Sequence, residues 1–153
     1  MPEQLLSDAE LLSRAGAGDE GAFTDLYRRR QAGLYRFAFQ MSGSGVVAED
    51  VVQEVFLALI RGTARYDAAR GSVAAFLYGI ARKQVLKALE RDARTESAEG
   101  SDFAAPADVA GDVERSRTVE AVREAVLALP VHYREVVVLC DVHGMEYAEA
   151  AAA

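Results

Sequence analysis

The sequence is poor in cysteine, because Cys140 is the only one in 153 residues. An intrachain disulfide is therefore excluded, and with it a secreted fold held together by disulfides. The two histidines add little to a metal site, since zinc normally takes three or four protein ligands. We interpret Cys140 as a buried thiol and His143 as a loop residue, and we expect no metal and no cofactor.

Long apolar runs are also missing. No segment reaches the roughly 18 consecutive apolar residues that a membrane-spanning helix needs. The first residues, Met1 to Leu6, lack the basic flank and apolar core of a signal peptide. We therefore expect no membrane span and a cytoplasmic location. Serine, histidine and acidic residues show neither a nucleophile elbow nor metal-ligand spacing, so we do not expect an enzyme.

The charge is distributed unevenly along the chain. The net charge of -7 argues against a general binder of polyanions. Residues 1–94, however, hold 13 Lys/Arg and 12 Asp/Glu, a net +1, whereas residues 95–153 hold 4 and 12, a net -8. We interpret this difference as two parts of the chain with different electrostatic tasks.

Apolar residues at helical spacing, separated by glycine and proline, predict an all-α protein. The first part should be a four-helix bundle, because the connections between its helices are short. Ser7 and Glu10 have the spacing of a capping box, and Asp19 is placed to cap the second helix. The four helices are expected at about 7–16, 20–41, 46–66 and 73–94.

A change of composition predicts the boundary between two small domains. Residues 95–112 are rich in Ala, Ser, Gly and Asp, contain Pro106, and have little to bury, which indicates a flexible acidic linker. We expect one domain at 1–94 and a second at 113–153. The second should contain helices at 113–129 and 133–140, a break at Gly144, and a last helix from Glu146.

Two faces of the first domain are candidate binding surfaces. On a helical wheel, the third helix turns Val51, Val55 and similar residues toward a core, while the opposite side groups polar residues around a leucine. These residues are Asp50, Gln53, Glu54, Leu57 and Arg61. Such a face suits docking onto a helix of another protein. A solvated polar face with one stray leucine is the alternative, and wheel geometry alone favours it.

The fourth helix carries a basic ridge opposite its apolar side. Lys83, Lys87, Arg91 and Arg94 recur over 11 residues, which is about 16 Å of helix and long enough to follow several phosphates. Phe76 precedes them on the same stripe. An aromatic ring beside cations suits a reader of single-stranded nucleic acid, because a base can stack on the ring. A solvated charged face is the alternative, and Glu90 and Asp92 weaken the field.

Two motifs in the first domain resemble those of a known family. The segments Glu49 to Leu57 (EDVVQEVFL) and Gly71 to Arg82 (GSVAAFLYGIAR) resemble the polymerase-binding and promoter-melting region of extracytoplasmic-function sigma factors of the sigma-70 family. The segments Leu129 to Leu139 and Gly144 to Ala151 resemble the start of that family's second conserved domain, a helix-turn-helix domain. The resemblance covers nearly everything outside the linker.

The resemblance implies a function and a set of site residues. The chain would bind RNA polymerase core, through the clamp helices of its largest subunit, and direct promoter recognition and DNA melting. By match, the third-helix face would contact the polymerase. The non-template strand at the −10 element would meet the loop from Asp67 to Ser72 and the following helix, and the DNA-binding candidates are Arg70, Ser72, Phe76, Arg82, Lys83, Lys87, Arg91 and Arg94. An anti-sigma factor is a further expected partner.

The chain departs from the family pattern in three places. The family usually has tryptophan at Phe76, asparagine at Lys83 and aspartate at Lys87, so the ridge here should be more electrostatic. The resemblance also places a basic recognition helix beyond Ala153. We therefore expect a truncated chain with no reader of the −35 element.

Two other functions remain open from the residues. One is a helix-turn-helix regulator without polymerase docking, and the other is a helical adaptor that binds only protein. For a sigma factor lacking its last helix, we expect the second domain to fold back on the first and to bring acidic residues beside Lys83, Lys87 and Arg91.

Overall fold

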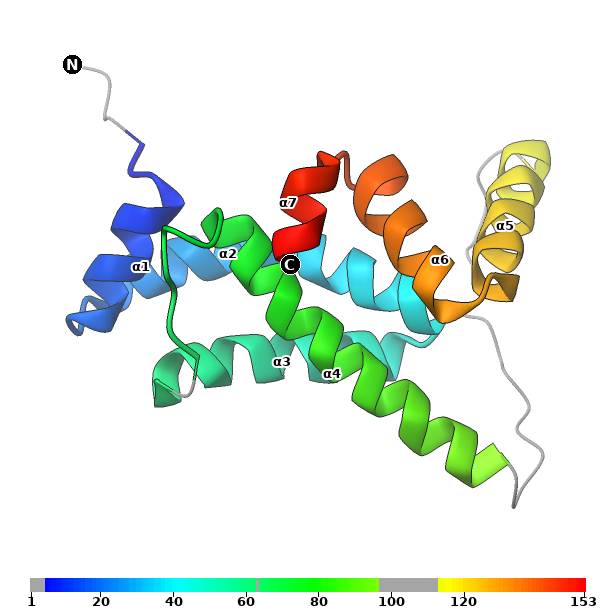
Figure 1. The fold of residues 1–153 in the computed structure, drawn as a ribbon, viewed down its shortest axis with the longest axis horizontal. Helices are drawn as coiled ribbons and strands as arrows, with labels where there is room; N and C mark the ends of the chain where they lie inside the picture. Colours follow the sequence, from blue (N-terminus) through cyan, green and yellow to red (C-terminus); the bar gives the residue numbers. More distant parts are fainter. Residues whose placement is uncertain (1–4, 63, 97–112) are drawn as a thin grey trace.

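The computed structural model describes residues 5–62, 64–96 and 113–153, and throughout these ranges the secondary structure is helical, without a strand. The predicted all-α fold is confirmed. The elements in chain order are α1 (Asp8–Gly16), α2 (Glu20–Ser42), α3 (Gly45–Arg61), α4 (Val73–Glu96), α5 (Val113–Ala128), α6 (Val131–Val136), the π-helical segment η1 (Val137–Val142) and α7 (Tyr147–Ala152) (Figure 1). Most of the expected linker, at 97–112, lies outside the described residues.

Local sequence signals determine where the first helices begin. The Ser7 hydroxyl accepts a hydrogen bond from the Glu10 amide at 3.2 Å, and the Glu10 carboxylate accepts one from the Ser7 amide at 2.7 Å. This is the predicted capping box. Asp19 accepts from the Ala22 amide at 3.0 Å, which confirms the second predicted cap.

Two expected helix boundaries were wrong. The third helix ends at Arg61 and not near Tyr66, because Gly62 adopts a left-handed conformation (φ 65°) that terminates it. The sixth helix starts at Val131, directly after Pro130, and continues beyond Val136 as a π-helical segment to Val142. Proline is well suited to the position just before a helix, where its missing N–H costs nothing.

The core of the first part lies between α2, α3 and α4. Its fully buried side chains include Phe37 and Met41 from α2, Val55 from α3, and Leu77 and Val85 from α4. The apolar side predicted for the third helix is confirmed, since Ala48, Val51, Val52, Val55 and Phe56 are all buried. The polar side of α3 is therefore left to face outward.

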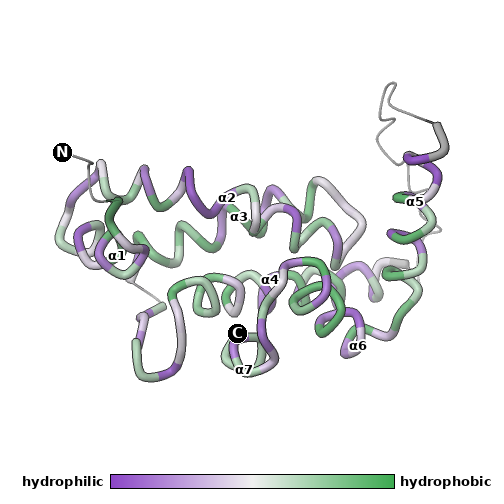
Figure 2. Tube along the Cα trace, turned by 90° about the horizontal axis from the view of Figure 1, so that it is seen from above, coloured by the Kyte–Doolittle hydropathy of each residue, from purple (hydrophilic) through white to green (hydrophobic). Residues whose placement is uncertain are grey.

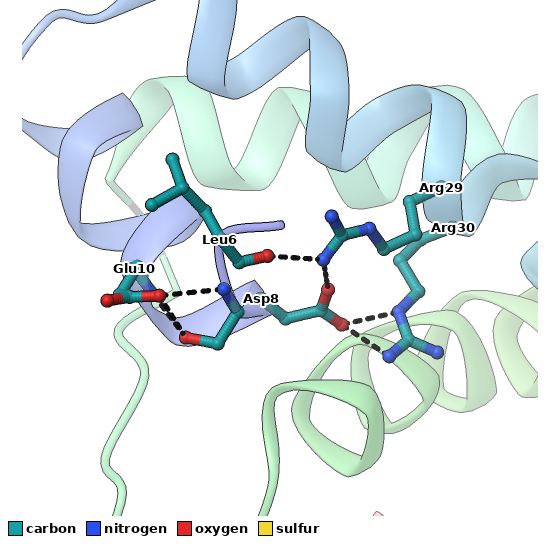
Figure 3. Close-up of polar contacts among 6 residues, drawn as sticks. Leu6, Asp8, Glu10, Arg29 and Arg30 are labelled. Atoms are coloured by element: carbon teal, nitrogen blue, oxygen red, sulfur yellow. Dashed lines mark hydrogen bonds and ion pairs between the residues drawn. The ribbon is translucent and has the colours of Figure 1, made fainter. Parts of the chain in front are cut away.

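One carboxylate holds α1 against α2 (Figure 3). Asp8 forms ion pairs with both Arg29, at 2.7 Å, and Arg30, whose Nε lies 2.6 Å from the carboxylate. Arg29 also donates to the Leu6 carbonyl at 2.9 Å. These two arginines are thereby occupied in joining helices, which leaves the basic residues of α4 as the better candidates for binding phosphate.

The C-terminal part packs on the helical bundle through a small apolar contact. Val138, Leu139 and Met145 are buried in the same core cluster as α2, α3 and α4. Gly144 forms the break between η1 and α7 with a positive φ of 70°, as predicted. Figure 2 shows α2 and α3 in one layer, α4, α6 and α7 below it, and α5 standing off at one end. Within the described ranges, no helix has the length and apolarity to cross a membrane.

Candidate functional site

The residues predicted to bind polymerase lie on the outer side of α3. Asp50, Gln53 and Glu54 are exposed and Leu57 is half-buried, one turn further along the helix. Together with α2, part of this face borders a groove of about 760 Å³ that includes Asp50, Gln53 and Leu57. The structure therefore places these three side chains along one surface. Arg61 is exposed in the last turn of α3 and is not among the residues that line this groove.

Aromatic and aliphatic side chains extend the same groove. Tyr27 and Tyr35 of α2 and Ile60 of α3 line it, and Ile60 is 65% exposed. The Tyr27 ring packs edge-on against Phe56, with centroids 4.8 Å apart. Tyr27 is 36% exposed at the groove, where α3 crosses α2.

A second groove, of about 320 Å³, lies between the loop after α3 and the start of α4. Four of the predicted DNA-binding residues line it, namely Arg70, Ser72, Phe76 and Lys83. The Phe76 ring lies against Tyr66, with centroids 5.6 Å apart, and the Tyr66 hydroxyl donates to the Gly71 carbonyl at 2.9 Å. The Ser72 hydroxyl accepts from the Ala75 amide at 3.1 Å and caps α4. This groove brings cations and an aromatic pair together.

The predicted basic ridge is divided between two grooves. Lys83 faces the loop groove described above, whereas Lys87, Arg91 and Arg94 line a groove of about 620 Å³ between α3 and α4. The other wall of this groove carries Asp50, Gln53 and Glu54 from α3. The two sets of predicted site residues are thus neighbours, which the separate helical wheels did not indicate.

Arg82, another predicted DNA-binding residue, lines neither of these two grooves. Its Nε lies 3.1 Å from the Glu135 carboxylate of α6, and both side chains are mostly shielded from solvent. A residue expected to contact DNA is therefore paired, in this conformation, with the C-terminal part of the chain. Within the described residues, the acidic residues expected beside Lys83, Lys87 and Arg91 form no ion pair with those three side chains, and Glu135 lies beside Arg82 instead.

The C-terminal helix α7 lies beside α4 (Figure 1), and its last residues line one side of the loop groove. The Ser72 hydroxyl donates to the Glu149 carboxylate at 3.0 Å, and Ala152 and Ala153 line the groove. Gly79 permits this close approach, because a Cβ at that position would lie 2.9 Å from the Ala153 carbonyl carbon. Tyr147, at the start of α7, is 77% exposed.

Polar contacts fix the rest of the C-terminal part. The Arg134 guanidinium donates to the Met41 carbonyl at 2.6 Å, and to the carbonyls of Leu127 and Leu129 at 2.7 and 3.0 Å. It thereby joins the C-terminal ends of α2 and α5, where carbonyls lack helical partners. Burial lowers the pKa of Arg134 from its ordinary value, but the group remains charged.

His143 connects η1 to α2 and α4. Its Nε2 lies 2.8 Å from the Gln40 side-chain oxygen and its Nδ1 lies 3.3 Å from the Tyr78 hydroxyl. Burial, aided by the charge of Arg36, lowers the pKa of His143, so the neutral ring is favoured at pH 7. Burial also raises the pKa of Tyr78. In the part of the chain that the structure describes, no cluster of His, Cys, Asp and Glu could hold a metal ion.

Comparisons with known proteins identify the family. The model of Sigma-70 region 2 matches residues 26–95, and that of Sigma-70 region 4 matches residues 119–153. The ECF RNA polymerase sigma factor SigM of Mycobacterium tuberculosis is 37% identical over 147 residues, which are 95% of this chain and 72% of SigM. The chain belongs to the extracytoplasmic-function sigma factors.

Two further proteins are similar to this chain. The sigma factor SigK of Mycobacterium bovis BCG is 28% identical over 159 aligned positions, covering 97% of this chain and 82% of SigK. A chain in the solved RsbN-BldN complex gives a TM-score of 0.42 at 27% identity, over 92% of this chain and 80% of that chain. As a sigma factor, the chain binds RNA polymerase core and directs promoter recognition in transcription initiation.

Proposed function

We propose that the outer face of α3 is the surface that docks on the clamp helices of the polymerase. The observation that supports it is the groove of about 760 Å³ along α2 and α3, where Asp50 and Gln53 lie beside Leu57 and the exposed Ile60. Polar groups around an apolar centre suit a helix of a partner, because the apolar contact supplies affinity and the rim supplies register. Glu54 and Arg61 extend the polar side of this face along α3.

Substitution at the centre of the face tests this proposal. Leu57→Glu combined with Gln53→Lys should weaken binding to core polymerase at least tenfold, because the buried centre of an interface tolerates charge poorly. Val122→Glu on α5 is the control, since it places a charge on an accessible apolar residue, 56% exposed, of another helix. Affinity would be measured by fluorescence anisotropy and helicity by circular dichroism. Unchanged affinity for core polymerase with intact helicity would show that this face does not dock on the polymerase.

We also propose that the loop groove receives the non-template strand of the −10 element. Arg70 and Lys83 are placed to meet phosphates, while the Tyr66–Phe76 pair offers an aromatic surface for an unstacked base. Extruding a base from the opening duplex converts recognition into free energy for melting. Lys87, Arg91 and Arg94 would continue the phosphate track along α4.

The DNA assignment is tested in the holoenzyme. Lys83→Gln with Lys87→Gln should slow promoter opening and reduce the dependence of DNA affinity on salt, because fewer counterions are released. Phe76→Ala should impair opening more than binding, whereas Phe76→Trp should preserve both. Arg28→Gln, on an exposed part of α2, is the charge control. Normal opening by the double lysine variant would mean that the ridge is only a solvated face.

We propose that residues 1–94 and 113–153 act as two domains in the cytoplasm, where polymerase and promoters are found, and that an anti-sigma factor restrains them. The matches to regions 2 and 4, at 26–95 and 119–153, support this division. An apolar groove of about 350 Å³ between α2 and α5, lined by Phe39, Val119 and Val122, would offer the anti-sigma factor a surface. The Val122→Glu variant should bind that partner more weakly while binding polymerase normally.

A further inference from the structure

The loop between α3 and α4 contains a turn with its own hydrogen bonds. The Arg70 amide donates to the Asp67 carbonyl at 3.0 Å, and the Ala69 amide donates to the Asp67 carboxylate at 2.9 Å. In such a turn an aspartate side chain takes the place of a backbone acceptor. All four residues at 67–70 are exposed, so packing does not hold the turn against the bundle. Its position therefore depends on the residues at its two ends.

Tyr66 joins the two ends of this loop. Its hydroxyl donates to the Gly71 carbonyl at 2.9 Å, so the hydrogen bond encloses the exposed turn. The ring is half-buried at the edge of the main core cluster and lies against Phe76, with centroids 5.6 Å apart. The hydroxyl thus belongs to a side chain that is anchored on the bundle. It can restrain a turn that packing leaves free.

We infer that Tyr66 is a positioning residue for capture of the −10 strand, and that its hydroxyl acts by ordering the turn at 67–70. Arg70, at the end of this turn, lines the loop groove together with Tyr66 and Phe76. A hydrogen bond that orders the turn before DNA arrives removes part of the conformational entropy that binding would otherwise cost. This inference rests on the proposed function, because it needs the loop groove to receive the non-template strand.

The hydroxyl and the ring of Tyr66 have separable roles. Tyr66→Phe keeps an aromatic ring of the same size against Phe76. The Gly71 carbonyl, however, loses its donor, and Gly71 has a φ of 155° that other residues rarely adopt, so it can move to many further conformations. The net contribution of one such hydrogen bond corresponds to about a fivefold change in an equilibrium constant. Because no charge is removed, the salt dependence of DNA binding should stay the same.

The test compares two fluorescent fork-junction DNAs bound to the holoenzyme. Both carry a single-stranded −10 segment, one with its bases and one with abasic sites throughout that segment. The phosphates are the same, so the ratio of the two affinities, measured by anisotropy, reports the capture of bases. Tyr66→Phe should weaken binding of the fork with bases about fivefold. The abasic fork should lose much less, because the long Arg70 side chain can reach a phosphate from several conformations of the turn.

A matched control and a second measurement separate positioning from stability. Tyr133→Phe also removes a hydroxyl, from a residue of α6 that is 67% exposed, and should change neither affinity. In the free chain, amide exchange measured by NMR should accelerate at Ala69 and Arg70 in Tyr66→Phe, because the turn is released. Unchanged exchange at both amides, or equal weakening of both forks, would overturn the inference.

Phe76→Ala keeps failure of the proposed function distinguishable. If this variant leaves the preference for the fork with bases unchanged, the loop groove does not capture bases, and the role of Tyr66 falls with it. If Phe76→Ala lowers that preference while Tyr66→Phe does not, the groove receives the bases and only the inference about Tyr66 is wrong. A lowered preference in both variants, with faster exchange at Ala69 and Arg70 in Tyr66→Phe, is the expected result.

Discussion

The N-terminal bundle and the C-terminal part are stabilised in different ways. The bundle has an apolar core of fully buried residues on α2, α3 and α4, such as Phe37, Val55 and Leu77. The C-terminal part buries only Val138, Leu139 and Met145 in that core, packs Val126, Val131, Ala150 and Ala153 against its edge, and adds polar contacts of Arg134, Glu135, His143 and Glu149. Apolar burial of the bundle's kind stabilises a fold on its own, whereas the polar contacts need the bundle as a template.

This contrast has a functional consequence. The α3 face proposed to bind polymerase is exposed in this conformation, but the loop groove on α4 is partly covered by α7, and Arg82 is paired with Glu135. Because α7 is held mainly by a few contacts at the surface of the bundle, it can detach without unfolding the bundle. The following predictions test the difference between the two regions, in order of decreasing effect.

Truncating a side chain in the core of the bundle should lower the free energy of unfolding more than any other change proposed here. Leu77→Ala removes a fully buried side chain and should lower the free energy of unfolding by about 3 kcal/mol. Val122→Ala on α5 should change it by less than about 0.5 kcal/mol, because Val122 is largely exposed. Urea unfolding followed by circular dichroism gives both values. Equal costs at the two sites would contradict the contrast.

Loss of the Arg134 guanidinium should release the C-terminal part alone. Arg134→Met leaves three carbonyls without their donor and should cost about 2 kcal/mol locally. Hydrogen exchange should accelerate in α6 and η1 and stay unchanged in the core of α2 to α4. Arg117→Met, at an exposed position of α5, is the control. Acceleration throughout the bundle would show that the two regions unfold as one unit.

Weakening the contacts that hold α6 and α7 on α4 should raise the affinity for DNA more than it lowers the stability of the chain. Glu135→Gln with Glu149→Gln removes the charges that hold Arg82 and Ser72, and should raise the affinity of the chain for −10 fork DNA about twofold. Glu124→Gln with Glu146→Gln removes two exposed charges of the same part and serves as the control. An equal gain in the control pair would mean that net charge, and not release of α7, is responsible.

Acidification should slightly destabilise the contact that His143 makes with Gln40 of α2 and Tyr78 of α4. The pKa of His143 is lowered below its ordinary value of 6.5, so the unfolded state takes up the proton first as pH falls. The stabilisation by the neutral ring is complete above pH 6.5 and is lost as pH falls from there through the folded-state pKa. Hydrogen exchange in η1 should therefore rise between pH 7.5 and 5.5 after correction for intrinsic rates. His143→Asn should abolish this pH dependence.

Several helix boundaries could be predicted from residues that lie close to them in the sequence. The capping box of Ser7, the cap at Asp19 and the break at Gly144 are encoded by residues within one turn, so the sequence alone predicts them. The error at Arg61 arose because the sequence does not show which glycine ends the third helix, and the error at Val131 arose because the sixth helix begins directly after Pro130. The π-helical segment η1 carried no local signal, and its Val138 and Leu139 are buried in the core cluster that α2, α3 and α4 share.

The candidate site, like the helices, was determined partly by the sequence alone and partly by the tertiary structure. The sequence by itself determined which helix faces are polar, since the spacing of Asp50, Gln53, Leu57, Lys83 and Lys87 follows from 3.6 residues per turn. Only the tertiary structure decided what those faces meet. It divided the ridge between two grooves, set Asp50 and Glu54 opposite Lys87 and Arg91, and paired Arg82 with Glu135 across the chain. The physical reason is that a helical wheel fixes directions around one axis, whereas neighbours depend on how several axes cross when their apolar sides are buried together.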